Sequence, residues 1–207
     1  SGRMMARKGP ILCRSAAIVT LALLPCCPAR AHLEATGMGP VYDGLLHFLT
    51  SLDDLVPALA LALLAGLRGA EYGRRALFAL PAAWLLGILA GLTAATISTG
   101  ALWTSLWFLV MGGLVVADAK LSLPATTMLA AALGLVHGYV NGTGMGLSPQ
   151  TVIAAVGLAS AVFILFVLVA AFVVQLRAEW ARIAVRVGGS WIAASGLLML
   201  GWSMRGV

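Results

Sequence analysis

The chain has 207 residues, of which 61% are hydrophobic and 10% are charged, and its mean hydropathy is +1.02. A soluble domain is about one quarter charged, so this composition excludes a water-soluble globular protein and predicts a chain that lies mainly in lipid. About six helices of about 20 residues each would nearly exhaust the length, which leaves no room for a soluble domain.

The first 31 residues have the layout of a cleaved secretory signal peptide. Residues 3–8 supply three basic side chains, an apolar run follows from about 16 to 27, and residues 29–31 read Ala-Arg-Ala, a small-x-small site. We expect cleavage after Ala31 and regard Ser1 and Gly2 as an expression scar. The alternative is an uncleaved extra helix, although the run is shorter than the roughly 20 residues that a span needs.

Removal of this segment changes the charge and the possible metal chemistry. It leaves eight basic and seven acidic residues, so the sequence pI of about 9.9 gives no reason to expect a nucleic-acid partner. All three cysteines lie within residues 1–31, so the mature chain has neither a disulfide nor a thiolate metal site. Any metal must be held by nitrogen and oxygen atoms.

Six apolar runs follow, separated by short connections that contain Gly, Pro or charge. They lie at about 44–67, 76–98, 101–118, 122–146, 150–175 and 185–203. We therefore predict an all-α membrane protein, a six-transmembrane-helix bundle over residues 32–207. Seven of the eight remaining basic residues follow the first, third and fifth runs, which by the positive-inside rule places these loops in the cytoplasm and both mature termini in the periplasm, with the bundle in the inner membrane.

Two sets of small and aromatic residues are best explained by packing. Gly134, Gly138 and Gly142 recur at every fourth position, as do Gly87 and Gly91, which permits close approach of helix backbones. The tryptophans are scattered along the runs, so we interpret them as interfacial or packing residues rather than as parts of a cofactor site.

Polar residues in the first run are the main candidates for a site. On a regular helix, Asp43, His47 and Asp54 fall within one narrow stripe, and Asp53 points roughly 120° from His47. A charge at the centre of a span costs about 2.5–3.5 kcal/mol, so the stripe should face the bundle interior. Every Lys and Arg of the mature chain lies in a predicted loop or at the end of a predicted span, and we therefore expect a cation or a proton to partner Asp54. The alternative is that Asp53 and Asp54 cap a broken helix before Pro57 or belong to a hydrogen-bond network.

The fourth run carries the second internal histidine. His137 and Asn141 are four residues apart and share a helix face. With a rise of about 1.5 Å per residue, His47 and His137 each come to lie roughly 5–8 Å below the outer surface, so they can meet. This arrangement predicts a divalent-metal site with His47, Asp54 and His137 as ligands and Asp43 and Asn141 at its mouth. Hydrogen bonding between helices is the alternative role for the two histidines.

Signal cleavage would create one more candidate ligand. As the new first residue, His32 would offer both its α-amino group and its imidazole to one metal, on a tether of about ten residues that contains glycine. A frayed terminus is the alternative.

These stretches resemble the HupE/UreJ family of membrane proteins, which is associated with nickel supply to hydrogenase and urease. The resemblance covers essentially the whole chain, including the segment Gly39–Gly44 that leads into the first run. The family's first motif is a His, five residues, then Asp-His. Here His47 is followed by five residues and Asp53, and Asp54 replaces the second His.

The fourth-span motif of the family resembles His-Gly-x-Ala-His-Gly-x-Glu, and residues 137–144 here read His-Gly-Tyr-Val-Asn-Gly-Thr-Gly. Asn141 therefore replaces the second His and Gly144 replaces the Glu. Two imidazoles and one carboxylate are lost and one carboxylate is gained, which makes the ligand set harder and richer in oxygen than nickel prefers.

Two functions remain open at this point. The resemblance implies a permease-like protein, not an enzyme, that takes a divalent transition metal, with nickel favoured, as its substrate, uses no prosthetic group and serves a hydrogenase or urease maturation system. The alternative is a non-transporting accessory or metal-holding subunit of another membrane complex. An intramembrane hydrolase is poorly supported, because the sequence has no His-Glu-x-x-His motif and no clear serine dyad.

Overall fold

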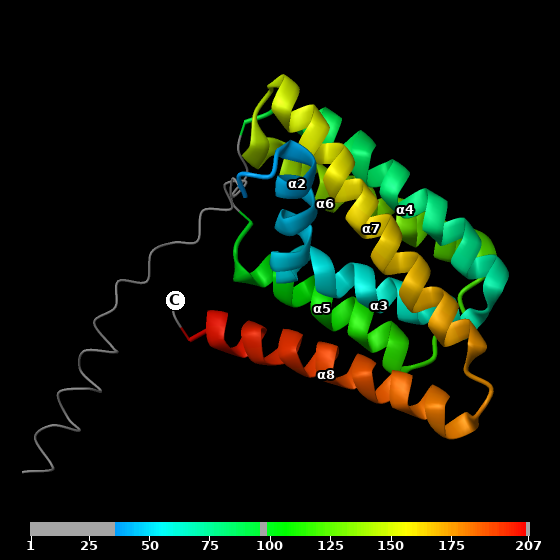
Figure 1. Ribbon diagram of the computed structural model, residues 1–207. Helices are drawn as coiled ribbons and strands as arrows, with labels where there is room; N and C mark the ends of the chain where they lie inside the picture. The colour runs from blue at the N-terminus through cyan, green and yellow to red at the C-terminus, as the bar shows by residue number, and fades with distance from the viewer. Residues whose placement is uncertain (1–35, 96–98, 206–207) are drawn as a thin grey trace, which may run out of the picture. The chain divides into compact units, whose positions relative to one another are not determined.

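The computed structural model describes residues 36–95 and 99–205. The predicted signal peptide and His32 lie outside the described residues. Within the described ranges the structure has seven helices and no strand (Figure 1). The helices are α2 (Pro40–Thr50), α3 (Leu52–Arg68), α4 (Ala70–Gly91), α5 (Ala101–Val116), α6 (Leu123–Met145), α7 (Pro149–Gln175) and α8 (Glu179–Ser203).

The helices overlap the apolar runs, which confirms the all-α prediction for the described residues. The predicted bounds differ most for α4, which covers Ala70–Gly91 rather than 76–98, and for α8, which begins at Glu179 rather than at 185. Local sequence explains several of the boundaries. Ser122 and Ser148 each accept a hydrogen bond from a backbone N–H in the first turn of α6 and α7, and each is followed by a proline in that turn. Gly69, at φ 118°, separates α3 from α4 in a conformation that a residue with a side chain rarely adopts.

The first run is not the single regular helix that the sequence analysis predicts. The chain leaves the helix at Ser51, which has extended backbone angles of φ −83° and ψ 92°, and α2 and α3 meet there at a bend of 75°. Asp53 and Asp54 lie in the first turn of α3, where carboxylates interact favourably with the helix dipole. The predicted regular helix is therefore wrong, and the alternative of a broken helix is confirmed, with the break six residues before Pro57.

Four helices, α4, α6, α7 and α8, are long and apolar enough to cross a membrane, and the bent pair α2 and α3 makes a fifth candidate span. The protein is thus a multi-pass membrane protein. Helix α5 is apolar but has only 16 residues, fewer than the roughly 20 that a straight span requires. The count of six spans therefore stays a prediction.

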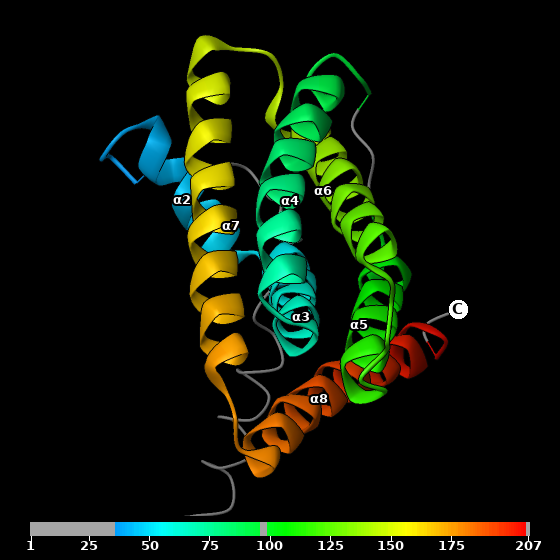
Figure 2. The same cartoon turned by 90° about the vertical axis from the view of Figure 1, so that its right-hand side faces the viewer.

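Helix α3 is the central element, and each of the other described helices contacts it. Its segment from Pro57 to Leu67 carries no charge and is buried over most of its length. A helix that is apolar on all sides is stable only when other helices surround it, so the sequence of α3 accounts for its place in the core. The closest packing partners are otherwise α4 with α6, α5 with α8, and α2 with α7 (Figure 2).

The predicted packing role of the spaced glycines is confirmed. A Cβ atom at Gly134, Gly138 or Gly142 of α6 would lie under 3.0 Å from backbone atoms of α4. Likewise, a Cβ atom at Gly87 or Gly91 of α4 would lie under 3.0 Å from backbone atoms of α6. The two backbones therefore interlock, and the register of α6 against α4 is fixed.

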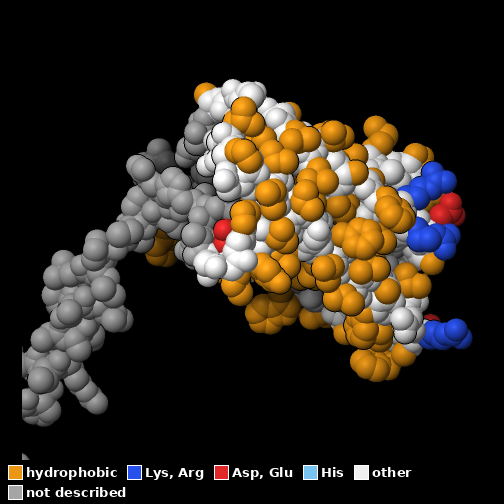
Figure 3. Space-filling view, turned by 45° about the horizontal axis from the view of Figure 1, so that its top comes forward, with side chains coloured by type: hydrophobic (Ala, Val, Ile, Leu, Met, Phe, Trp, Pro, Cys, Tyr) orange, Lys and Arg blue, Asp and Glu red, His pale blue; other side chains and the backbone are white. Residues whose placement is uncertain are grey.

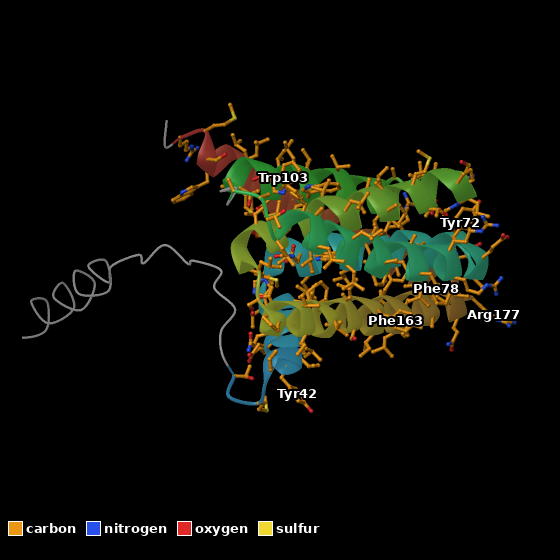
Figure 4. All side chains as sticks on the ribbon, turned by 90° about the horizontal axis from the view of Figure 1, so that it is seen from above. Tyr42, Tyr72, Phe78, Trp103, Phe163 and Arg177 are labelled. Atoms are coloured by element: carbon orange, nitrogen blue, oxygen red, sulfur yellow. The ribbon has the colours of Figure 1, made fainter. Side chains whose placement is uncertain are left out.

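The connections that follow the first, third and fifth runs lie at one end of the described helices. Arg182 of α8 donates to the carbonyl of Leu67 at the end of α3, and Arg186 donates to the carbonyl of Val116 at the end of α5, over 3.0 and 2.9 Å. Both arginines satisfy carbonyls that helix ends leave without partners. We call this end, at which Figure 4 shows Arg177, the basic end.

Candidate functional site

Four polar side chains from three helices form one hydrogen-bonded network at the end opposite the basic end. His137 Nδ1 lies 2.8 Å from Asp54 Oδ1, and Asn141 donates through Nδ2 to Asp54 Oδ2 over 2.9 Å. The Oδ1 atom of Asn141 lies 3.3 Å from Nε2 of His47. The order of contacts is therefore His47, Asn141, Asp54, His137, and we call these four residues the polar relay.

Burial increases along the polar relay. His47 and Asn141 are partly exposed, whereas Asp54 is 6% exposed and His137 is 4% exposed. No Lys or Arg in the described residues pairs with Asp54, as the sequence predicts, and its partner is the His137 imidazole. The hydrogen-bond alternative that the sequence analysis left open is thus realised in the structure.

The contact with Asp54 determines which nitrogen of His137 is available. A carboxylate is an acceptor, so Nδ1 of His137 carries the hydrogen that it shares with Asp54. In the neutral imidazole, Nε2 then keeps its lone pair, and this atom is buried without a hydrogen-bond partner in the described part of the chain. A carboxylate that holds one nitrogen of a histidine while the other faces a metal is a recurring arrangement in metalloproteins.

Two tryptophans enclose the inner imidazole, and the sequence analysis did not place them at the site. The ring centroids of Trp84 in α4 and Trp107 in α5 lie 5.5 and 5.2 Å from that of His137. Trp84 is fully buried, and its Nε1 atom also lacks a hydrogen-bond partner among the described residues. The glycine spacing was the sequence signal that could have placed Trp84 near the site, because Trp84 packs against Gly138, the residue that follows His137.

The local sequence explains how the relay is assembled. The break at Ser51 starts α3 anew, so that Asp54 in its first turn faces α6, while His47 remains on α2. The interlocked glycines of α4 and α6 bring the backbone of α6 against Trp84 and so set the position of His137. The relay thus depends on one helix break and one close helix packing.

The structure places one further predicted site residue, Asp43, outside the relay. Asp43 accepts hydrogen bonds from the backbone N–H and the hydroxyl of Thr36 and does not join the relay. His32 lies outside the described residues. Asp53 is exposed, and its carboxyl group interacts with the side chain of Thr104 in α5 and, through charge only, with Asp54 and His137.

The relay differs from a preassembled metal site. Within residues 36–95 and 99–205, no group of three or more His, Cys, Asp or Glu residues is arranged to hold a metal ion. Both carboxylate oxygens of Asp54 already accept hydrogen bonds, and Asn141 separates His47 from Asp54. A metal at His137 Nε2 would therefore need further ligands from water or from a change in the relay.

Comparison with known proteins agrees with the motif-based resemblance. The family model described as HupE / UreJ protein matches residues 19–199 of the chain. A search of curated proteins and a search of solved structures each gave no match. The match covers most of the chain and includes all four residues of the polar relay, and the chain therefore belongs to the HupE / UreJ family.

Proposed function

We propose that this protein is a permease-like carrier of a divalent transition-metal ion, with nickel favoured, from the periplasm across the inner membrane. The HupE / UreJ family is associated with transport of nickel or cobalt or with accessory roles in their supply. The client would be a metalloenzyme maturation system, such as that of hydrogenase or urease. Both mature termini would lie in the periplasm, which places the polar relay on the side from which the ion enters.

The observation that carries this proposal is the buried His137 with its unpartnered Nε2 atom. Asp54 keeps the imidazole in the orientation and tautomer that leaves Nε2 free to bind a cation. His47 is more exposed and would receive the ion first, and Asn141 would pass it toward His137. Two imidazole nitrogens and one carboxylate can bind a divalent transition-metal ion, and the set is richer in oxygen than nickel prefers.

A specific observation favours a second candidate, a non-transporting accessory or metal-holding subunit. The described residues contain no group of three His, Cys, Asp or Glu side chains arranged around one point. Two positions at which the family motifs have histidine are occupied by Asp54 and Asn141. In this case the relay would stabilise the contact between α3 and α6, and ion transport would belong to another protein.

Metal accumulation in nickel-limited cells distinguishes the two candidates. Cells that produce His47→Ala or His137→Ala should accumulate less nickel than cells with the wild-type protein, at equal protein abundance measured by immunoblot. Asp53→Ala is the matched control, because it removes an exposed carboxylate next to the relay. Equal accumulation in wild type, His47→Ala and His137→Ala would eliminate the permease proposal and support the accessory role.

A further inference from the structure

A groove of about 270 Å³ lies between α4 and α7 near the basic end. Its walls are apolar and include small side chains that leave space between the two helices. The apolar lining includes Gly73, Leu77, Phe166, Ala170, Ala171 and Val174. Among the described residues, Arg74 and Gln175 are the only ones with polar side chains in the lining.

The position of the groove in two candidate spans restricts what can fill it. Its α7 lining extends from Phe166 to Gln175, which corresponds to roughly 14 Å along the helix. One leaflet of the hydrocarbon core is about 15 Å thick. The length of the groove therefore matches the thickness of one leaflet. At this depth in a bilayer, the apolar ligand that surrounds the protein is the acyl chain of a lipid.

Arg74 lacks the protein partners that three other arginines at the basic end have. Arg75 pairs with Glu71 at 3.5 Å, and Arg182 and Arg186 donate to carbonyls at helix ends. Arg74 is exposed, lines the groove and makes no ion pair or hydrogen bond with the residues that the structure describes. Figure 3 shows Lys and Arg side chains gathered at one end of a face that is otherwise largely hydrophobic.

We propose that the groove between α4 and α7 binds an anionic phospholipid, with one acyl chain along the groove and the phosphate on Arg74. An unpaired guanidinium at the mouth of an apolar groove complements an anionic head group joined to an apolar tail. Gln175, at the same end of the α7 lining, offers an amide donor to the head group. The zwitterionic lipids of the bilayer lack the net negative charge that Arg74 selects.

Native mass spectrometry of the full chain in detergent tests this proposal with phosphatidylglycerol and phosphatidylcholine of identical acyl chains. The wild-type protein should retain more phosphatidylglycerol than phosphatidylcholine. Arg74→Gln should lower phosphatidylglycerol binding about fivefold, which corresponds to about 1 kcal/mol for one basic residue near the membrane surface. Arg75→Gln is the matched control and should lower it less, because Arg75 is paired with Glu71 and does not line the groove.

Two further arms identify the ligand. Ala171→Phe adds a large side chain to an exposed part of the groove lining and should reduce binding of both lipids. Inorganic phosphate at the lipid concentration should not displace phosphatidylglycerol. Equal retention of both lipids by the wild type, equal effects of Arg74→Gln and Arg75→Gln, no effect of Ala171→Phe, or displacement by phosphate would each overturn the proposal.

Discussion

Asp54→Ala is expected to destabilise the protein, because it removes the shared acceptor of the polar relay. The substitution leaves the Nδ1 hydrogen of His137 and the Nδ2 group of Asn141 without their acceptor inside the bundle. Hydrogen bonds between membrane helices are worth about 0.6 kcal/mol on average and about 1.7 kcal/mol at most, so the loss of two lowers the free energy of unfolding by about 1–3 kcal/mol.

From the sequence alone, Asp54→Ala would be expected to stabilise the protein, because it removes a buried charge. The structure predicts a loss of stability instead, because two hydrogen-bond donors satisfy the Asp54 carboxylate and so compensate for its removal from water. Asp53→Ala is the adjacent control. Asp53 is exposed, interacts with the side chain of Thr104 and lies in the first turn of α3, so its loss should cost about 0.3–1 kcal/mol.

Unfolding of the detergent-solubilised protein by dodecyl sulfate, followed by circular dichroism, measures these differences. In the double variant Asp54→Ala with His137→Ala, the loss should be smaller than the sum of the two single losses by about 0.6–1.7 kcal/mol, the worth of their contact. An Asp54→Ala protein that is as stable as the wild type, or no more destabilised than Asp53→Ala, would refute the proposed hydrogen-bonded role of this carboxylate.

Three other predictions concern packing, topology and processing. Gly138→Ala should lower the free energy of unfolding by about 1–3 kcal/mol, because the new Cβ atom would meet the backbone of α4. The control is Gly113→Ala, whose Cβ atom meets no atom within 4 Å, so this variant should be as stable as the wild type or more stable. Thermal unfolding compares the two variants, and equal stability would contradict the interlocked packing. A reporter active only in the periplasm should work when fused after Val207 and fail when fused at Tyr72. The reverse pattern would show that the bundle has the opposite orientation in the membrane. Intact-mass measurement of the membrane-extracted protein should find His32 as the first residue, and a longer chain would remove its proposed chelating role.

The sequence predicts the helices well because hydrophobic content and spacing are local properties. Each apolar run contains at least one helix, and the glycines at every fourth position do pack against a neighbouring helix. The family resemblance, carried by the motifs around His47 and His137, is confirmed by the family match. Mutual proximity of the relay residues was also predictable in part, because depth along a span follows from residue count.

The tertiary structure alone decides how the relay is connected. A regular helix through Ser51 gives a continuous stripe that contains Asp43, but the bend separates Asp43 from Asp54. The Ser51-Leu-Asp-Asp sequence is typical of a helix start, yet such a signal competes with the apolar run on both sides, and only packing against the other helices selects the break.

The environment of His137 is likewise a property of the assembled bundle. Trp84 and Trp107 are on different helices, and no spacing within either helix relates them to His137. Whether a buried carboxylate is an uncompensated charge or a satisfied acceptor depends on side chains more than 80 residues away in the sequence. The sequence determines which residues are too polar for lipid, and the packing of α3, α4, α5 and α6 determines which of them meet, because only close contact between helices satisfies polar groups where water is absent.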